Sequence, residues 1–143
     1  MTDTHVHAPV VTEAGPSGEL CTRTLAMPAD TNPSGDIFGG WLMCQMDIAA
    51  GTAAARHARG RCATVCVETI NFHAPVKVGD EVGVWAELIT VGRTSMRFKV
   101  SAWRRAHDSD VAVKVTDGNF TYVSIDDQGR PQEIKQDPSL LET

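Results

Sequence analysis

Apolar and small residues recur at offsets of three and four between positions 42 and 54, the spacing of one face of an α-helix. The residues in this pattern are Leu42, Met43, Met46, Ala49, Ala50, Ala53 and Ala54. Arg56, His57 and Arg59 follow where cations suit the negative end of the helix dipole, and Gly60 is a natural stop. Because the flanks of this helix are also nearly all apolar or small, the pattern predicts a central helix that is covered on both sides.

Other segments alternate between apolar and polar residues, or are rich in β-branched residues, as β-strands do. We expect strands over residues 20–26, 62–72, 82–91, 95–103 and 111–125, with Gly118 as a bulge in the last one. Short turns between neighbouring long strands favour an antiparallel sheet. The predicted fold class is therefore α+β, with a curved antiparallel sheet of about five strands wrapped round one long central helix.

The chain divides into three parts by composition. Residues 1–18 are polar and rich in Pro, Gly and Thr, which predicts a flexible N-terminal tail. Residues 19–131 hold all the predicted elements and form one domain. Residues 132–143 are charged and are expected to form a C-terminal tail. Two histidines in the first tail, His5 and His7, could bind a metal, but exposed tail histidines are the commoner case.

Overall charge and apolar content exclude several classes of protein. The net charge is −5 and there is no run of Lys or Arg, so we expect no nucleic-acid partner. No apolar run approaches the roughly 20 residues of a membrane span, and the first residues do not resemble a signal peptide. The cysteines have no zinc-ligand spacing and lie in apolar patterns, which predicts small buried hydrophobes in a reducing cytoplasm: Cys21, Cys44, Cys62 and Cys66.

The chemistry of the chain is concentrated at the predicted helix. Gly39 and Gly40 lie at its start, where bare backbone N–H groups at the positive end of the dipole can receive a ligand. Asp47 lies in its middle, where an unpaired carboxylate in apolar surroundings costs several kcal/mol. A catalytic role explains both features, whereas a structural role would make Asp47 a buried cap or the ion-pair partner of an arginine on a neighbouring strand.

Weaker candidates surround this helix. Asn32 lies in the preceding loop, where most asparagines only stabilise turns. His73 could act as an acid or base, although a histidine at the end of a strand is more often structural. Residues 93–95 (Arg93, Thr94 and Ser95) form a turn that could contact a phosphate or simply be solvated.

Several familiar motifs are absent. Residues 30–35 resemble the start of a calcium-binding EF-hand loop, but Trp41 occupies the position of the bidentate glutamate. The glycines at 35–40 are not followed by the Lys-Ser/Thr of a phosphate loop, and there is no G-x-S-x-G nucleophile motif. We therefore expect neither a metal nor another cofactor.

Four blocks of the sequence closely resemble the hot-dog-fold acyl-CoA thioesterases of the YciA type. They are residues 27–51, residues 70–72 with 75–80, residues 91–95 and residues 120–123. The resemblance covers about residues 20–130, and Gly118, Asn119 and His73 depart mildly from it. It implies hydrolysis of fatty acyl-CoA to the free acid and coenzyme A without a metal. It also implies a homodimer joined edge to edge, commonly within a hexamer built as a trimer of dimers.

The same resemblance assigns roles to the candidate residues. Asp47 matches the catalytic carboxylate, and Asn32 matches an active-site asparagine. Gly39 and Gly40 match the backbone that polarises the thioester carbonyl. The turn of Arg93, Thr94 and Ser95 matches one that contacts coenzyme A.

Helix geometry leads to a further hypothesis. Asp47 could act as a general base or as a nucleophile, and the sequence does not separate these routes. Gly40 and Asp47 lie on roughly one helix face but about 10 Å apart along the axis, too far for one carbonyl centre to touch both. We therefore expect a composite site at a twofold interface, with Asn32 and Asp47 from different subunits. The alternatives are a non-catalytic acyl-CoA-binding module and a hydratase, although His57 lies too far along for a hydratase pair with Asp47.

Overall fold

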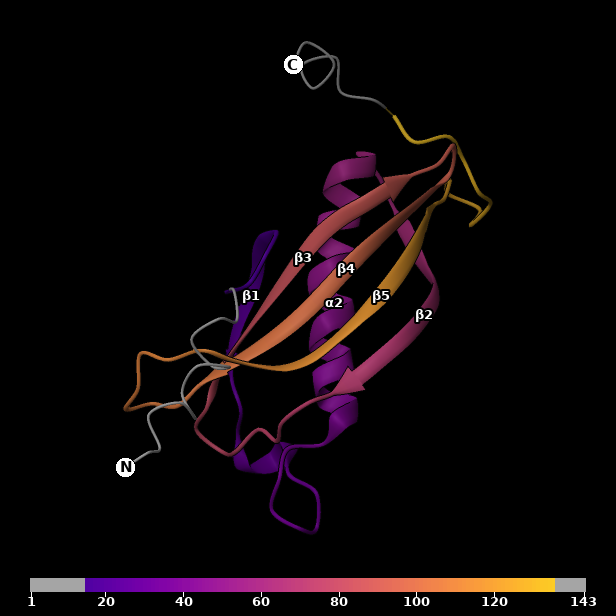
Figure 1. The fold of residues 1–143 in the computed structure, drawn as a ribbon. Helices are drawn as coiled ribbons and strands as arrows, with labels where there is room; N and C mark the ends of the chain where they lie inside the picture. The colour runs from indigo at the N-terminus through magenta and orange to yellow at the C-terminus, as the bar shows by residue number, and fades with distance from the viewer. Residues whose placement is uncertain (1–14, 136–143) are drawn as a thin grey trace.

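The computed structural model describes residues 15–135 and confirms the predicted fold class (Figure 1). Strand β1 (Glu19–Leu25) and the short 3-10 helix η2 (Pro28–Asp30) lead to the long helix α2 (Gly39–Ala58). Strands β2 (Cys62–Phe72), β3 (Glu81–Val91), β4 (Ser95–Arg105) and β5 (Val113–Ser124) follow. All pairings are antiparallel and the order across the sheet is β1-β3-β4-β5-β2, so β1 and β2 are its edges.

Helix α2 ends one residue before the predicted stop. Arg59 adopts the left-handed conformation with φ of 57°, and its N–H bonds back to the carbonyls of Ala55 and Arg56. The N–H of Gly60 then donates to the Ala55 carbonyl at 3.1 Å. The predicted glycine therefore follows the residue that turns the chain, and it still helps to satisfy the last carbonyls of the helix.

One face of α2 packs on the sheet and forms the core. Its buried residues are those of the predicted apolar pattern, together with Ala58 and without Met43. They meet the alternating inward-facing residues of the strands, among them Val82, Val84, Met96, Phe98 and Val100. These mostly small residues let the sheet pack closely on the helix, which lies behind the sheet in the view of Figure 1.

The opposite face of α2 corrects the prediction that both sides are covered. Within residues 15–135, that face is left open: Met43 and Ile48 are 37% and 52% exposed, and Cys44 is exposed as well. Cys66 on the β2 edge is also exposed, so the prediction of buried cysteines is wrong for Cys44 and Cys66. Such an apolar face is typical of a surface that packs against another element, and residues 15–135 do not supply one.

The prediction of a bulge at Gly118 is wrong: β5 has its extra residue at Val115, opposite β4, and β2 has an extra residue close to Gly118. Between Glu68 and Asn71, β2 contains one residue more than β5 does between the paired residues Asn119 and Asp117. A second irregularity follows Thr64 in β2. Gly118 pairs regularly with β4, but a Cβ there would lie 2.3 Å from Cδ1 of Ile70. The glycine therefore marks a close approach of two strands.

Residues beyond the strands are described in part. Gln132 N–H donates to the Ser124 carbonyl at 2.8 Å and Ile134 N–H to the Arg93 carbonyl at 3.0 Å, so this segment returns to the β3–β4 turn. The expectations for residues 1–14, including His5 and His7, and for residues 136–143 lie outside the described residues. No helix within 15–135 is long and apolar enough to cross a membrane.

Candidate active site

Asp47 lies half-buried on α2, beside the β2 and β5 strands. Its Oδ1 accepts hydrogen bonds from the Tyr122 hydroxyl at 2.7 Å and the Thr64 hydroxyl at 2.8 Å. Thr64 and Tyr122 are cross-strand partners in β2 and β5, which explains why both reach the same carboxylate. Among residues 15–135 Asp47 makes no ion pair, so the alternative of an arginine partner does not hold there.

Tyr122 is an almost fully buried donor, with 1% of its surface exposed. Burial raises the pKa of its hydroxyl, and the hydrogen bond to the Asp47 carboxylate raises the pKa further, well above the usual range of tyrosine. The phenol therefore stays protonated at neutral pH. It can donate a hydrogen bond to Asp47, but it cannot serve as a base.

The start of α2 has the geometry expected of an anion cradle. The N–H groups of Trp41 and Leu42 donate to the Phe38 carbonyl at 3.1 and 3.4 Å. Those of Gly39 and Gly40 have no acceptor among the described residues. A Cβ on Gly40 would meet nothing within 4 Å, so a ligand can approach its backbone directly.

Gly39 is closer to its surroundings than Gly40. A Cβ added there would lie 3.2 Å from the ring of Phe72, at the end of β2. Because Gly39 has no side chain, the Phe72 ring can pack against the first turn of α2. The ring is nevertheless 52% exposed.

Asn32 shapes the loop that enters the helix. Its Oδ1 accepts hydrogen bonds from the backbone N–H groups of Ser34 at 2.9 Å and Asp36 at 3.2 Å. Its own N–H donates to the Asp36 carbonyl at 2.7 Å. The side-chain oxygen of Asn32 is thus committed to the turn, while its amide nitrogen has no acceptor within residues 15–135.

Arg93, Thr94 and Ser95 form the β3–β4 turn, at the end of the molecule opposite the start of α2 (Figure 1). The Thr94 carbonyl accepts the N–H of Ser124 at 2.8 Å. The Arg93 guanidinium is exposed and lies 3.7 Å from the Glu133 carboxylate. The predicted site residues of one chain therefore lie at both ends of the molecule, and the structure does not bring Arg93 and Gly40 together.

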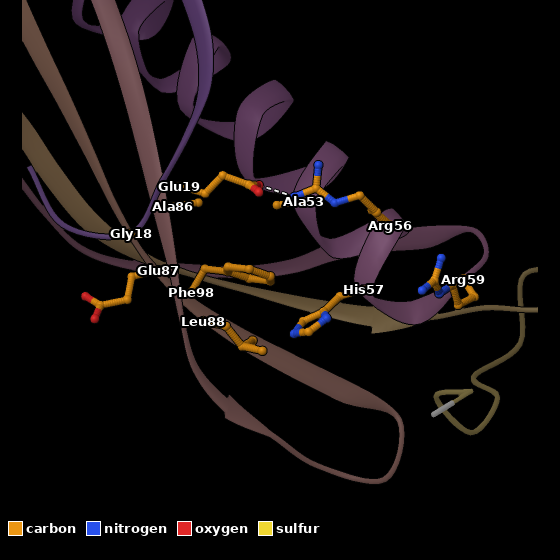
Figure 2. Close-up of a pocket in the computed structure, with 10 residues that line it drawn as sticks. All are labelled: Gly18, Glu19, Ala53, Arg56, His57, Arg59, Ala86, Glu87, Leu88 and Phe98. Carbon is orange, nitrogen blue, oxygen red and sulfur yellow. Dashed lines mark hydrogen bonds and ion pairs between the residues drawn. The ribbon is translucent and has the colours of Figure 1, made fainter. Parts of the chain in front are cut away.

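A cavity of about 480 Å³ lies elsewhere, between the C-terminal half of α2 and strands β1, β3 and β4 (Figure 2). Ala53, Leu88 and Phe98 line it, and an ion pair between Arg56 and Glu19 crosses its rim. Its lining includes His57 but none of the predicted site residues. Because Asp47 faces the β5–β2 side of the sheet, His57 and Asp47 do not form the pair that a hydratase would need.

Sequence reasoning missed two residues of this site, Thr64 and Tyr122. Tyr122 is the single tyrosine of the chain and falls on the inward face of its strand with Phe120. A buried tyrosine usually needs a hydrogen-bond partner, and Asp47 needed a donor. These two requirements together could have predicted from the sequence that Tyr122 bonds to Asp47.

The chain thus combines a long helix packed on a five-stranded antiparallel sheet with a carboxylate in mid-helix and a bare helix start. A model of the thioesterase superfamily matches residues 34–110, and the chain belongs to this superfamily. Over 122 residues it is 45% identical to the acyl-CoA thioester hydrolase YciA of Escherichia coli K12, which covers 83% of this chain and 92% of that protein. The predicted resemblance to the YciA type is confirmed.

Solved structures agree with this assignment. A hexameric thioesterase from Yersinia pestis is 45% identical with a TM-score of 0.82, over 85% of this chain and 99% of that one. A hexameric hotdog-fold thioesterase of Campylobacter jejuni is 35% identical with a TM-score of 0.78, over 82% and 91% of the two chains. The fold of the chain is therefore the hot-dog fold.

Proposed function

We propose that this protein hydrolyses fatty acyl-CoA thioesters to the free acid and coenzyme A, with Asp47 as the catalytic carboxylate. Membership of the superfamily and the close relation to YciA support the activity. The observation that carries the role of Asp47 is its setting: it is held by two hydroxyl donors on a mostly apolar helix. Two donors of this kind hold the carboxylate in one orientation.

The start of α2 supplies the second requirement of thioester hydrolysis. Negative charge develops on the carbonyl oxygen in the transition state, and the N–H groups of Gly39 and Gly40 are positioned to receive it. Losing one such donor typically costs about two to three orders of magnitude in rate. Asn32, in the loop before these glycines, can add its side-chain amide to the same region.

A complete site requires two chains. Gly40 and Asp47 lie about 10 Å apart along the axis of one helix. Two such helices running past each other in opposite directions would bring Gly40 and Asn32 of one chain near Asp47 of the other. The open face of α2 and the β2 edge, with Val65 55% exposed, supply an apolar surface for this contact.

The assembly we propose is a homodimer joined along β2, three of which form a hexamer. The hexameric state of the related thioesterases supports it. In this assembly the turn of Arg93, Thr94 and Ser95 contacts the phosphates of coenzyme A. The described cysteines are unpaired, which supports a reducing compartment, the cytoplasm.

Replacement of Asp47 tests the proposal. We expect Asp47→Ala and the closer isostere Asp47→Asn to fold and assemble normally but to lose most of the thiol released from both a short and a long acyl-CoA. Thiol release by the purified oligomer is the measurement. Turnover at the wild-type rate in either variant would remove Asp47 from the mechanism.

The same assay separates the alternatives. A wild-type protein that binds acyl-CoA but releases no thiol would be a binding module on this fold.

A further inference from the structure

We propose that Tyr122 and Thr64 act together as positioning residues that hold Oδ1 of Asp47, so that Oδ2 is the atom that reacts. This inference rests on the proposed function, because it assigns the geometry of the same carboxylate. Oδ1 receives both hydroxyls, at 2.7 and 2.8 Å, while Oδ2 accepts no hydrogen bond from residues 15–135. The two oxygens of one carboxylate therefore have different surroundings.

The Tyr122 hydroxyl cannot move aside. Its ring packs edge-on against Phe98 with centroids 6.0 Å apart and stacks with Phe120 at 6.5 Å. On the helix side it meets Gly51, one turn after Asp47, where an added Cβ would lie 3.5 Å from the ring. A ring held by three neighbours places its hydroxyl in one position, so that position is set before substrate arrives.

Thr64 is aimed by the backbone of β2. The register of β2 against β5 slips directly after Thr64, where Val65 is the extra residue. Such bulges re-aim the side chains beside them. The sheet thus presents one hydroxyl from each of its two outermost strands on this side to the same oxygen of Asp47.

This arrangement directs the chemistry to Oδ2. In the general-base route Oδ2 takes a proton from water as the water oxygen bonds to the thioester carbon. When the C–S bond breaks, the same proton passes from Oδ2 to the sulfur, which releases the thiol of coenzyme A. Tyr122 and Thr64 keep their own protons throughout, because both are already donating to Oδ1. A carboxylate free to rotate would lose part of this alignment, and small misplacements can cost up to about 100-fold in rate.

The test compares variants that differ by single hydroxyls. We expect Tyr122→Phe to lower kcat by about 10- to 100-fold with KM changed less than about twofold, because the lost group acts on the reacting atom and not on binding. Thr64→Val should lower kcat about tenfold, and Thr64→Ser, which keeps the donor, should restore it. Thr121→Val is the matched control. Thr121 directly precedes Tyr122 on β5 and points to the other face of the sheet, so this change should leave kcat unchanged.

Steady-state kinetics on the assembled enzyme and thermal unfolding decide the outcome. The proposal is overturned by a folded Tyr122→Phe enzyme with wild-type kcat, by a loss confined to KM, or by Thr64→Ser as slow as Thr64→Val. If Tyr122→Phe does not fold, the two Thr64 variants still decide. A wild-type protein that is inactive on every acyl-CoA would instead contradict the proposed function itself.

Discussion

At the scale of residues, the candidate acid or base His73 belongs to a polar cluster with Lys114 and Asp117 just after β2. His73 Nε2 and Lys114 Nζ each lie 3.2 Å from a carboxylate oxygen of Asp117. Burial works to raise the pKa of the Asp117 carboxyl, but the hydrogen bonds from His73 and Lys114 outweigh it, and the pKa falls below its usual range. His73 is therefore a structural partner of Asp117 in this chain.

This cluster predicts an acid-sensitive contribution to stability. A lowered carboxyl pKa favours the folded state above the unfolded value of about 3.9, and the benefit disappears as the pH falls through the folded pKa. We expect Asp117→Asn to lower the free energy of unfolding by about 1 kcal/mol at pH 7. Urea denaturation at pH 7 and pH 3 measures it, and the difference from wild type should shrink at pH 3.

Asp127→Asn serves as the control, because Asp127 lies exposed in the turn after β5. It should leave the free energy of unfolding unchanged at both pH values. A difference for Asp117→Asn that is as large at pH 3 as at pH 7 would contradict the electrostatic account.

The sequence identified Asp47 because a carboxylate in an apolar helix is costly wherever the helix packs. It did not identify Thr64 and Tyr122, which come from strands 17 and 75 residues further along the chain. Their meeting depends on the pairing of β2 with β5 and on the face that each strand presents. Local patterns determine neither the pairing nor the face. The sequence could still have suggested the contact, because a buried phenol requires an acceptor and a lone carboxylate requires a donor.

At the scale of elements, periodicity was enough to locate the helix and all five strands within about two residues of their observed ends. The bulge was predicted at the wrong residue because a glycine in a strand can mark either a bulge or a close approach of a neighbour. Here Ile70 of β2 fills the space beside Gly118, and Thr69 before it takes the strained φ of 58°. Tertiary packing, which decides between the two meanings, is not visible in a local pattern.

The contact between Gly118 and Ile70 can be tested with two substitutions. Gly118→Ala should destabilise the fold by about 1–3 kcal/mol, because the new methyl would overlap Cδ1 of Ile70. Ile70→Val removes that atom and should recover part of the loss in the double variant. Equilibrium urea unfolding of the four proteins of this cycle is the measurement. Additive effects would mean that the two side chains do not meet.

At the scale of the whole molecule, the open face of α2 is the main finding. The sequence predicted that this helix, apolar on nearly every side, is covered on both sides. Residues 15–135 cover only one of them, and helix periodicity does not say which element covers a face. The sheet is the first cover, and we propose a second copy of the chain as the other.

Mixed oligomers test whether sites are shared between chains. Gly40→Pro removes one N–H from the first turn, where proline is tolerated, and Gly40→Ala keeps that N–H as its control. Asp47→Ala and Gly40→Pro proteins should each be nearly inactive alone. After unfolding and refolding together in equal amounts, they should recover about a quarter of wild-type activity, since half the dimers would carry one intact site.

Thiol release before and after mixing is the measurement. A mixture no more active than its components would show that each site is built from one chain. Gly40→Ala, which keeps the N–H, should be more active than Gly40→Pro.

The chain holds only one tyrosine, and its hydroxyl donates a hydrogen bond to Asp47, the carboxylate that we propose as catalytic. Isotope labelling of tyrosine would therefore produce a single phenol signal in an NMR spectrum, with no assignment needed. That signal would respond to the arrival of substrate or product beside Asp47. The protein thus carries its own spectroscopic reporter next to the carboxylate that we propose as catalytic.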